Sequence, residues 1–461
     1  MIRLFKHYIP RSLLVLGLVE FLVFLFSVQL GFAVRFSSGL IGDDAHLITI
    51  KSVVFAAVMY SSMIAMGLYQ RHLRDGRKGM FMRLVAAFAI GFVAMSLLFY
   101  LFPHLLLWRG TFALTLVFAF VGVVFARLVY IKLVNREDLN RRILVAGAGK
   151  KALLMETLLK RRTDRRGFTV VGFVRIGDEE VCVDEQKLIP HETPLNDLVQ
   201  QHDVDEIVLA ITDRRKKFPV EELLDCKMSG VTVTEIISFF ERQSGRIILE
   251  MLQPSWLIFS DGFSHGAFRN VSKRIFDVVA SLILLLVTFP FMLLAMICIY
   301  VEDRGPVFYK QVRVGQNWRL VQVLKFRSMR TDAEKAGAQF ATTNDDRVTR
   351  VGRFIRKTRI DELPQLFNVL KGEMSFVGPR PERPQFVEAF SARIPFYAER
   401  HRVKPGITGW AQISYPYGAS EKDTIEKLQY DLYYVKNYSL FLDLTILFQT
   451  AEVILWGKGA R

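Results

Sequence analysis

Cysteine is scarce in this sequence. The 461 residues include three cysteines, Cys182, Cys226 and Cys298, which are scattered along the chain. They lack the paired spacing of a metal site and the even number that a disulfide framework requires. The thiols are therefore expected to be reduced, as in the cytoplasm, wherever the chain lies outside lipid.

Two nucleotide-binding signatures are also absent. Leu144 occupies the position of the first glycine of a P-loop, so the glycines and Lys150 that follow it do not form one. No tyrosine is followed four residues later by a lysine, the pair expected of a sugar epimerase or dehydratase. A membrane-anchored nucleotide-sugar epimerase or dehydratase is therefore a weaker alternative for the function.

Acidic residues are fewer than basic ones, and apolar residues are unusually common. Asp and Glu number 45 against 61 Lys and Arg, which gives a formal net charge of +16. Hydrophobic residues make up 51% of the chain, and the mean hydropathy is +0.25, more than a soluble protein usually carries. The cations cluster beside apolar segments, so anionic lipid and phosphate-bearing substrates are the expected partners rather than nucleic acid.

Four apolar segments near the N-terminus each approach the roughly 20 residues that a helix needs to span a bilayer. They cover residues 12–34, 52–69, 84–107 and 110–134. The first is too long for the apolar run of a cleavable signal. Lys and Arg precede the first segment, separate the second from the third and follow the fourth, so the positive-inside rule places both ends in the cytoplasm. Residues 1–139 are thus predicted to form a four-helix transmembrane unit.

Residues 140–262 show a different pattern, in which short apolar runs alternate with polar helical stretches. Such alternation predicts a Rossmann-like α/β domain with a parallel sheet. The first run ends in Gly147-Ala-Gly149, which resembles the glycine fingerprint of dinucleotide-binding domains. Arg175 follows the second run, where an NAD-binding domain has an acidic residue. The glycines are compatible with a nucleotide site and with a tight turn alone.

A fifth apolar stretch, residues 275–301 within an expected helix of residues 272–301, is interrupted by Pro290. Basic residues bracket the stretch on both sides: Lys273, Arg274, Arg304 and Lys310. Two cytoplasmic ends predict a re-entrant helix that enters and leaves the membrane on the same face, with its break at Pro290. An ordinary fifth span kinked at the proline is the alternative.

The last apolar stretch, residues 440–456, carries polar residues at helical intervals, Asp443 among them. This spacing predicts an interfacial amphipathic helix rather than a membrane span.

Asp361 and Glu362 stand before a short stretch with helical signals. The apolar residues after them have helical spacing, Pro364 suits a first turn, and Gly372 is a stop signal. Asp361 is therefore predicted at or near the N-cap of this helix. Two adjacent carboxylates at such an end either stabilise the helix, by capping it and complementing its dipole, or hold Mg²⁺ and a phosphate there.

Two short basic segments accompany the carboxylates. Lys325 lies in the run Lys-Phe-Arg-Ser-Met, and Arg380 is held between Pro379 and Pro381. Because prolines restrict the backbone, a cation between them is held in place. Fixed cations suit a pyrophosphate whose negative charge must be neutralised during transfer.

Several motifs in this sequence occur in the same order as in a known protein family. Residues 273–436 resemble the bacterial sugar transferase family, the monotopic phosphoglycosyl transferases that start polysaccharide and glycoconjugate assembly. With the four apolar segments and the Rossmann-like domain, the whole chain resembles the long-form polyprenyl-phosphate hexose-1-phosphate transferases. The matching runs are Arg347-Val-Thr-Arg-Val-Gly-Arg leading to Asp361-Glu362-Leu-Pro-Gln, Met374-Ser-Phe-Val-Gly-Pro-Arg-Pro, and Val403-Lys-Pro-Gly-Ile-Thr-Gly-Trp-Ala-Gln.

The resemblance implies roles for individual residues. Asp361 would be the nucleophile that takes the sugar phosphate from a UDP-sugar and releases UMP, with Glu362 assisting at a Mg²⁺ ion that both carboxylates hold. Undecaprenyl phosphate would then accept the hexose-1-phosphate. Direct attack by the lipid phosphate, with Asp361 as base, is the alternative. Lys325 and Arg380 match phosphate-binding positions, and Asp431 matches a further active-site position.

The expected protein is a multi-domain membrane enzyme. Its parts are the transmembrane unit of residues 1–139, the Rossmann-like domain of residues 140–262, and a mainly α catalytic domain of residues 263–461 that includes the re-entrant helix. It would lie in the bacterial inner membrane with the catalytic domain on the cytoplasmic face, and a homodimer is expected. Whether the middle domain binds a ligand, regulates the enzyme or builds the dimer stays open, as does the sugar. A non-catalytic scaffold for polysaccharide assembly is the remaining alternative.

Overall fold

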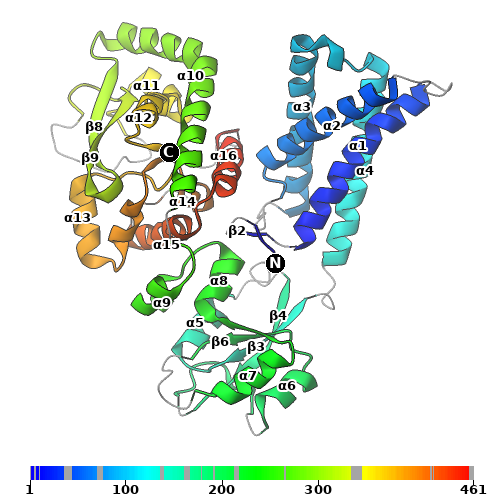
Figure 1. The fold of residues 1–461 in the computed structure, drawn as a ribbon. Coiled ribbons are helices and arrows are strands. Elements are labelled where there is room, and N and C mark those ends of the chain that lie inside the picture. The colour runs from blue at the N-terminus through cyan, green and yellow to red at the C-terminus, as the bar shows by residue number, and fades with distance from the viewer. Residues whose placement is uncertain are drawn as a thin grey trace.

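The computed structural model describes residues 2–4, 7–9, 11–35, 44–69, 76–134, 140–159, 167–177, 179–190, 193–211, 218–263, 266–333, 345–415, 418 and 420–455. Figure 1 shows these residues as three parts: a helical unit in blue and cyan, an α/β part, and a part that begins with the long helix α10. A short hairpin precedes the helical unit: β1 (Ile2–Leu4) and β2 (His7–Ile9).

The first part is a bundle of apolar helices. Its helices are α1 (Arg11–Arg35), α2 (Asp44–Ala65), α3 (Gly76–Leu101) and α4 (Arg109–Val134). α1 packs on α2 and α4, and α2 packs on α3. Aromatic rings close the bundle between α3 and α4, where the ring centroids of Phe88 and Phe120 are 5.1 Å apart. Many large apolar side chains remain exposed on the outer faces, as expected where a bundle meets lipid.

The predicted spans match these helices apart from shifts at both ends of α2 and of α3. α2 begins at Asp44 rather than at position 52, and α3 ends at Leu101 because Pro103 opens a separate 3-10 turn, η1 (Pro103–Leu105). Among the described residues, five helices are long and apolar enough to cross a membrane, α1 to α4 and α10. The cations at 70–75 and 135–139, which support the predicted orientation, lie outside the described residues.

A buried ion pair lies inside the bundle. Glu20 of α1 pairs with Arg127 of α4 at 2.7 Å and accepts a 2.5 Å hydrogen bond from the hydroxyl of Tyr69. Arg127 also donates to the carbonyl oxygen of Leu68. Because a lone charge is costly in an apolar bundle, this pairing explains how the carboxylate is tolerated there.

The second part has the predicted α/β pattern. Its described strands form a five-stranded parallel sheet in the order β5-β4-β3-β6-β7, so the first strand in sequence lies in the centre, as in Rossmann-like sheets. Its strands are β3 (Arg141–Ala146), β4 (Phe168–Val174), β5 (Leu188–Ile189), β6 (Glu206–Leu209) and β7 (Thr232–Glu235). Its helices are α5 (Lys150–Leu158), η3 (Glu185–Lys187), α6 (Leu195–Gln201), α7 (Val220–Met228), α8 (Ile236–Ser244), η4 (Leu249–Met251) and α9 (Pro254–Phe259).

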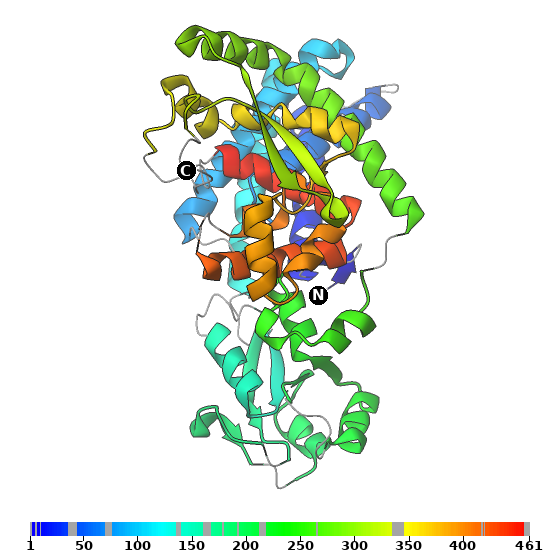
Figure 2. The ribbon, with the colours of Figure 1, turned by 90° about the vertical axis from the view of Figure 1, so that its left-hand side faces the viewer.

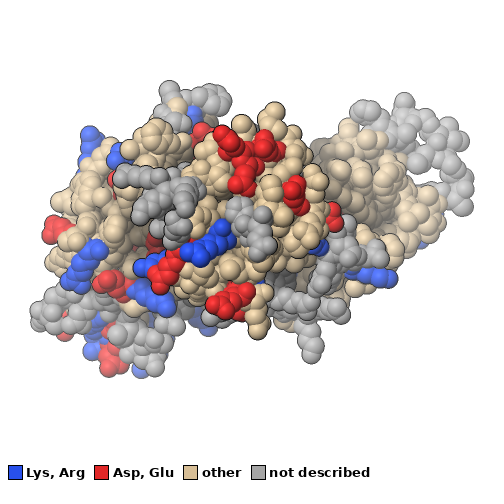
Figure 3. All heavy atoms as spheres, turned by 90° about the horizontal axis from the view of Figure 1, so that it is seen from below, with Lys and Arg blue, Asp and Glu red and all other residues tan. Residues whose placement is uncertain are grey.

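The face seen from below in Figure 3 carries both signs of charge. Where described atoms are visible, Asp and Glu side chains lie among Lys and Arg side chains. The described atoms visible in this view therefore do not form a patch of one sign.

The third part is mainly α, with two small sheets. β8 and β9 form an antiparallel hairpin, and β10 pairs with β11 in parallel. Its strands are β8 (Phe308–Val314), β9 (Leu320–Phe326), β10 (Ser375–Val377) and β11 (Gly406–Thr408). Its helices are α10 (Ala267–Asp303), η5 (Gln316–Trp318), α11 (Arg350–Lys357), η6 (Ile360–Glu362), α12 (Gln365–Lys371), α13 (Pro384–Arg393), η7 (Tyr397–Arg402), α14 (Trp410–Ser414), α15 (Glu421–Asn437) and α16 (Leu440–Leu455).

α10 is bent. It remains helical through Pro290, and Figures 1 and 2 show two helical arms that meet at an angle. A proline removes one backbone hydrogen bond of a helix and is the usual cause of a sharp kink. Near it, the hydroxyl of Thr288 donates to the carbonyl oxygen of Leu284 at 2.7 Å. The helix is longer than the predicted range 272–301.

Both ends of α10 contact the same folded part. Near its start, Arg274 donates to the carbonyl oxygens of Val369 and Leu370 in the last turn of α12, each at 2.6 Å. At its end, Glu302 accepts a 2.7 Å hydrogen bond from the backbone of Arg350, which opens α11, and Asp303 pairs with Arg327. A straight helix through a bilayer would separate these two ends by the thickness of the hydrocarbon.

The position of Asp443 in α16 differs from the polar outer face that the sequence predicts. The helix packs on α10, α14 and α2, and Asp443 is fully buried rather than part of a polar outer face. Its carboxylate pairs with Lys273 at 2.6 Å and accepts from the hydroxyl of Tyr434 at 2.7 Å. Helical spacing alone could not tell a polar outer face from this internal ion pair.

The second and third parts share a buried interface. Glu241 of α8 pairs with Lys436 of α15 at 2.7 Å, and Asn437 donates to the same carboxylate at 2.7 Å. The indole of Trp410 donates to the carbonyl oxygen of Gly245 at 2.7 Å. Apolar residues of both parts also belong to one continuous core. α15 is therefore held on one side by the α/β part.

Candidate active site

Asp361 and Glu362 lie in the 3-10 turn η6 rather than at the N-cap of an α-helix. α12 begins later, with Pro364 in its cap position, so Asp361 lies near the cap but three residues before it, and the alternative in which Asp361 caps this helix is wrong. The physical reason is Arg359, whose left-handed backbone (φ 59°) starts a separate turn before the helix. Oδ1 of Asp361 is buried and has no hydrogen-bond partner among the described residues. This oxygen is therefore not engaged in capping.

Glu362 is surrounded by cations. Its Oε1 lies 3.1 Å from Nζ of Lys325, 2.9 Å from Nη2 of Arg380 and 3.8 Å from Nη1 of Arg359. Burial raises the pKa of Glu362, but these three charges outweigh it and lower the pKa overall. Burial raises the pKa of Asp361, and the charge of Glu362 raises it further. The two neighbouring carboxylates thus have opposite electrostatic environments.

The β8–β9 hairpin and α12 together place Lys325. Val323 and Lys325 share one face of β9, and Val323 is buried against α12. Asn368 of α12 binds the edge of the strand, because its amide donates to the carbonyl oxygen of Gln322 at 2.8 Å and accepts from the backbone of Leu324 at 3.0 Å. The lysine therefore reaches the carboxylates from a strand that is locked to the following helix.

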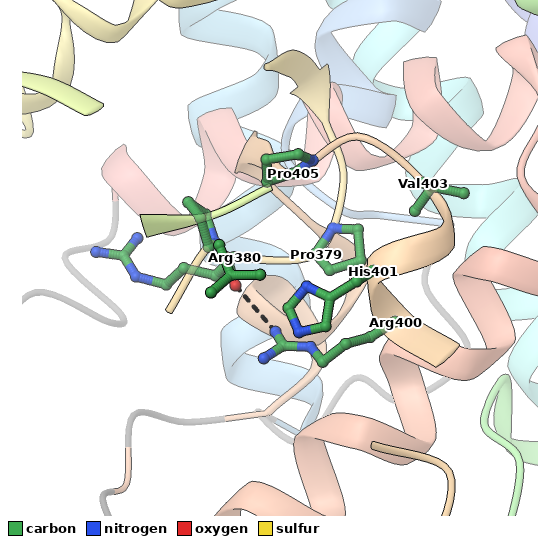
Figure 4. A pocket seen from close by; sticks show the side chains of 8 residues that line it. Pro379, Arg380, Arg400, His401, Val403 and Pro405 are labelled. Carbon is green, nitrogen blue, oxygen red and sulfur yellow. Dashed lines mark hydrogen bonds between the residues drawn. The ribbon is translucent and has the colours of Figure 1, made fainter. Parts of the chain in front are cut away.

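Close backbone packing places Arg380. A β-carbon at Gly378 would lie 2.3 Å from the carbonyl oxygen of Lys404, and one at Gly406 would lie 2.0 Å from the nitrogen of Gly378. The β10 and β11 segments can approach this closely only with glycine at these positions. Figure 4 shows Arg400 reaching the carbonyl oxygen of Arg380, to which it donates at 2.9 Å.

Asp431 is linked to the carboxylate pair through other residues. It lies on α15, is buried, and pairs with Arg400 at 2.8 Å. Burial raises its pKa, against the opposing charge of Arg400. Because Arg400 also holds the backbone of Arg380, Asp431 fixes the segment that brings Arg380 to Glu362.

His401 lies beside Arg400 in the small pocket of Figure 4. Its ring packs against Trp318 at 5.3 Å between centroids, and Nε2 is buried without a hydrogen-bond partner among the described residues. Burial, with a further contribution from the charge of Arg400, lowers the pKa of His401 to about 3. The imidazole is therefore neutral at physiological pH.

A cavity of about 570 Å³ opens over these residues. Its described lining includes eleven lysine and arginine side chains against three carboxylates, those of Asp361, Glu382 and Asp431. Asp361 lines the cavity, while Glu362 lies behind it and holds the cations in place. The structure thus brings Asp361, Glu362, Lys325 and Arg380 together around a basic cavity, with Asp431 in its wall. Such a cavity suits a substrate with several negative charges.

The carboxylate pair can take part in binding a magnesium ion. No group of three or more His, Cys, Asp or Glu with the geometry of a metal site occurs among the described residues. Mg²⁺ does not require one, because it usually binds one or two carboxylates together with substrate phosphates and water. The unpartnered Oδ1 of Asp361 beside Glu362 fits that arrangement.

The glycine loop of the α/β part is a second candidate site, and one of its amides is already engaged. The backbone N–H of Ala148, beside the N-terminus of α5, donates to Oε1 of Glu179 at 2.6 Å. A β-carbon at Gly149 would lie 2.8 Å from Oε2 of the same carboxylate. An internal carboxylate thus occupies the place where a phosphate would lie in a dinucleotide-binding domain. Arg175 follows β4 as expected from the sequence.

Sequence analysis missed Asn368 and Arg400. Asn368 lies among helix-forming residues, and its bonds to a strand more than forty residues away leave no local signal. Arg400 belongs to the run Glu-Arg-His-Arg at 399–402, which is typical of an exposed surface, yet the structure buries it. A single arginine with a buried carboxylate partner cannot be told from its surface neighbours in the sequence alone.

Two families of known proteins match the chain. A family described as bacterial sugar transferase matches residues 268–457, which include α10 and the carboxylate pair. A family described as a CoA-binding domain matches residues 64–221, which extend from the helical unit into the α/β part.

Three curated relatives are similar over larger segments. The UDP-N-acetylgalactosamine-undecaprenyl-phosphate N-acetylgalactosaminephosphotransferase of Aeromonas hydrophila is 45% identical over 52% of this chain and 56% of its own length. The undecaprenyl-phosphate glucose phosphotransferase of Komagataeibacter xylinus is 36% identical over 70% of this chain and 60% of its own length. The UDP-glucose:undecaprenyl-phosphate glucose-1-phosphate transferase of Klebsiella pneumoniae is 34% identical over 70% and 69%. The chain thus spans little more than half the length of the first two.

The buried imidazole predicts a pH-dependent stability. Between pH 6.5, near the ordinary pKa of histidine, and a pKa of about 3, the unfolded chain binds a proton at His401 that the folded chain does not. This group therefore lowers stability as the pH falls, by up to about 1.4 kcal/mol per pH unit. The His401→Gln variant should lose less stability than the wild type between pH 6.5 and 4.5, measured as the thermal unfolding midpoint in detergent. Equal losses would contradict a neutral buried imidazole.

Proposed function

Because this chain belongs to the bacterial sugar transferase family, we propose that it transfers a hexose-1-phosphate from a UDP-sugar to undecaprenyl phosphate. This reaction would be the first membrane step in the assembly of an exopolysaccharide or glycoconjugate. The relatives are named for different sugars and for the same lipid acceptor, so the acceptor is the better supported part of the proposal.

The observation that carries the proposal is the setting of Asp361. Its side chain lines a basic cavity, and its Oδ1 lacks a partner among the described residues. Glu362 beside it is neutralised by Lys325 and Arg380. An unengaged carboxylate that faces a cluster of cations is suited to attack a phosphate whose charge those cations neutralise.

The proposed reaction has two steps at one phosphorus atom. A carboxylate oxygen of Asp361 attacks the sugar-bearing phosphorus, the bond from that phosphorus to the bridging oxygen breaks, and UMP leaves with the electron pair. A phosphate oxygen of undecaprenyl phosphate then attacks the same phosphorus, and the carboxylate of Asp361 is released. Arg380 and Lys325 hold Glu362 and contribute positive charge beside the transferred phosphate.

Asp361 and Glu362 would hold Mg²⁺ together with phosphate oxygens. When bound, the ion would neutralise charge on the pyrophosphate and on the leaving UMP. The residues fit this role because both carboxylates are present and one oxygen of Asp361 is unengaged.

We place the protein in the bacterial inner membrane, with the third part on the cytoplasmic face, where UDP-sugars are made. Two observations support a re-entrant α10: the bend in a helix that contains Pro290, and the contacts of both its ends with one folded part. Such a helix would anchor the site at the membrane surface, where the phosphate of the lipid acceptor lies. The expected homodimer stays a prediction.

The alternatives account less well for the structure. A scaffold with Asp361 and Glu362 as helix caps is disfavoured, because neither forms the cap of α12. An epimerase or dehydratase would need a dinucleotide in the α/β part, where Glu179 already occupies the glycine loop.

The covalent step predicts a burst of UMP without lipid. Wild-type enzyme mixed with UDP-sugar alone should release about one equivalent of UMP, because the sugar phosphate remains on Asp361. The isosteric Asp361→Asn variant should lose the burst, and its overall turnover should fall on the order of a thousandfold or more. Asp332→Asn, at an exposed position, is the matched control and should behave as wild type. Absence of a wild-type burst would favour direct transfer with Asp361 as base.

Metal removal gives a second prediction. EDTA should stop turnover, and added Mg²⁺ should restore it, because the pyrophosphate otherwise remains unneutralised next to two carboxylates. The Glu362→Gln variant should need a higher Mg²⁺ concentration for half-maximal rate. Full turnover in EDTA would exclude the proposed metal.

The re-entrant geometry predicts that both ends of α10 lie on the same side of the membrane. In a protein whose three cysteines are replaced by serine, Asp261→Cys and Arg319→Cys introduce exposed thiols before and after α10. A membrane-impermeant thiol reagent should label neither variant in intact spheroplasts and both after lysis. Labelling of one of them in intact spheroplasts would show that α10 spans the membrane.

A further inference from the structure

A second residue that lines the cavity carries a buried acceptor without a partner, which the proposed reaction leaves unused. Among the described residues, two side-chain oxygens that are buried without a hydrogen-bond partner belong to residues lining this cavity. One is Oδ1 of Asp361, and the other is Oε1 of Gln412. A buried acceptor without a partner lowers stability and calls for an explanation, such as a ligand that supplies the missing donor.

The local structure fixes which atom of Gln412 is left unpaired. The side-chain amide Nε2 donates to the carbonyl oxygen of Ile407 at 3.2 Å, so the amide is oriented with Oε1 as the remaining acceptor. The residue lies on the short helix α14, and its backbone N–H donates to the carbonyl oxygen of Gly409 at 3.0 Å. A β-carbon at Gly409 would lie 3.2 Å from Oε1, so glycine at this position leaves room around the acceptor.

The lining of the cavity suits the organic part of a nucleotide-sugar as well as its phosphates. Phe386 and Phe390 of α13 and Tyr415, which follows α14, line the same cavity. The hydroxyl of Tyr415 is already engaged, because it donates to Asp423 at 3.0 Å. These rings offer flat apolar surface, on which nucleobases and the apolar faces of hexoses pack, and Gln412 adds a polar residue to the lining of the same cavity.

We propose that Gln412 binds the nucleotide-sugar by accepting a hydrogen bond at Oε1 from an N–H or O–H donor. The donor is the imide of the uracil base or a hydroxyl of the hexose. This inference rests on the proposed function and adds to it a residue that contacts the substrate away from the reacting phosphorus. A site with a buried acceptor discriminates strongly against ligands that lack the matching donor, so Gln412 contributes to substrate selection.

The Gln412→Met variant tests this assignment. It keeps the length of the side chain and removes the acceptor, so KM for the UDP-sugar should rise about tenfold, the usual effect of losing one hydrogen bond, while kcat changes little. Gln429→Met is the matched control, because Oε1 of Gln429 is also buried and unpartnered but the residue does not line the cavity. The control should keep the wild-type KM, whatever its effect on thermal stability.

Inhibition by UMP distinguishes the two donors. If the inhibition constant of UMP rises by the same factor in Gln412→Met, the donor is in the nucleoside. If it is unchanged while KM for the UDP-sugar rises, the donor is in the hexose. A KM within twofold of wild type overturns the inference. Wild-type protein that neither consumes UDP-sugars nor binds UMP overturns the proposed function as well.

A measurement on the wild type keeps the inference testable if Gln412→Met does not fold. N3-methyl-UMP lacks the imide donor, and UDP-hexoses that each lack one hydroxyl lack the alternative donors. At least one of these analogues should bind about tenfold more weakly than its parent. If all of them bind as well as their parents, Gln412 has no donor in the substrate.

Discussion

The neutralised charge of Glu362 is the interaction on which the site depends. Two adjacent buried carboxylates repel each other, so both can be ionised only if cations offset one of them. Lys325, Arg380 and Arg359 meet at one oxygen of Glu362 and do so from three separate segments. Asp361 is thereby left with an oxygen that nothing in the described residues engages. Glu362 is paired and Asp361 keeps an unpaired oxygen because of where the cations lie, and not because of any difference between the two side chains themselves.

The cations can meet there because the chain packs unusually closely at a few glycines. A β-carbon at Gly352 would lie 2.0 Å from the carbonyl oxygen of Ser328, so α11 can lie directly on the segment after β9. Gly378 and Gly406 lie in two segments that pack on each other next to Arg380. A β-carbon on either glycine would collide with the backbone of the other segment. α10 then contacts α12 near its start and α11 at its end, which holds the elements on either side of the carboxylate pair against one anchor. The glycines in the sequence motifs therefore allow the close backbone packing that brings the cations to Glu362.

The sequence predicts the elements whose signals lie in neighbouring residues. The strands of the α/β part follow runs of apolar residues, and α12 ends at Gly372 (φ 85°), where glycine adopts a backbone that other residues avoid. That Asp361 does not cap α12 could not be predicted, because Arg359 adopts a left-handed backbone that non-glycine residues rarely take. Asp443 and Arg400 were not recognised as buried, because their partners, Lys273 and Asp431, lie far away in the sequence. The spacing of polar residues identifies the polar face of a helix. It does not show whether that face contacts solvent or a buried partner.

The α/β part reaches the site through α15. Asp431 lies on one side of this helix and holds Arg400, while Lys436 and Asn437 at its end bind Glu241 of α8. Removing one partner of a buried ion pair is far more costly than the pair is stabilising, so Glu241 and Lys436 favour one docked arrangement over alternatives. The glycine loop of that part is engaged by Glu179. The buried ion pair between the α/β part and the third part thus lies on the helix that supports Arg380, with Trp410 of α14 as a further contact, and a nucleotide in the glycine loop is not needed to explain either contact.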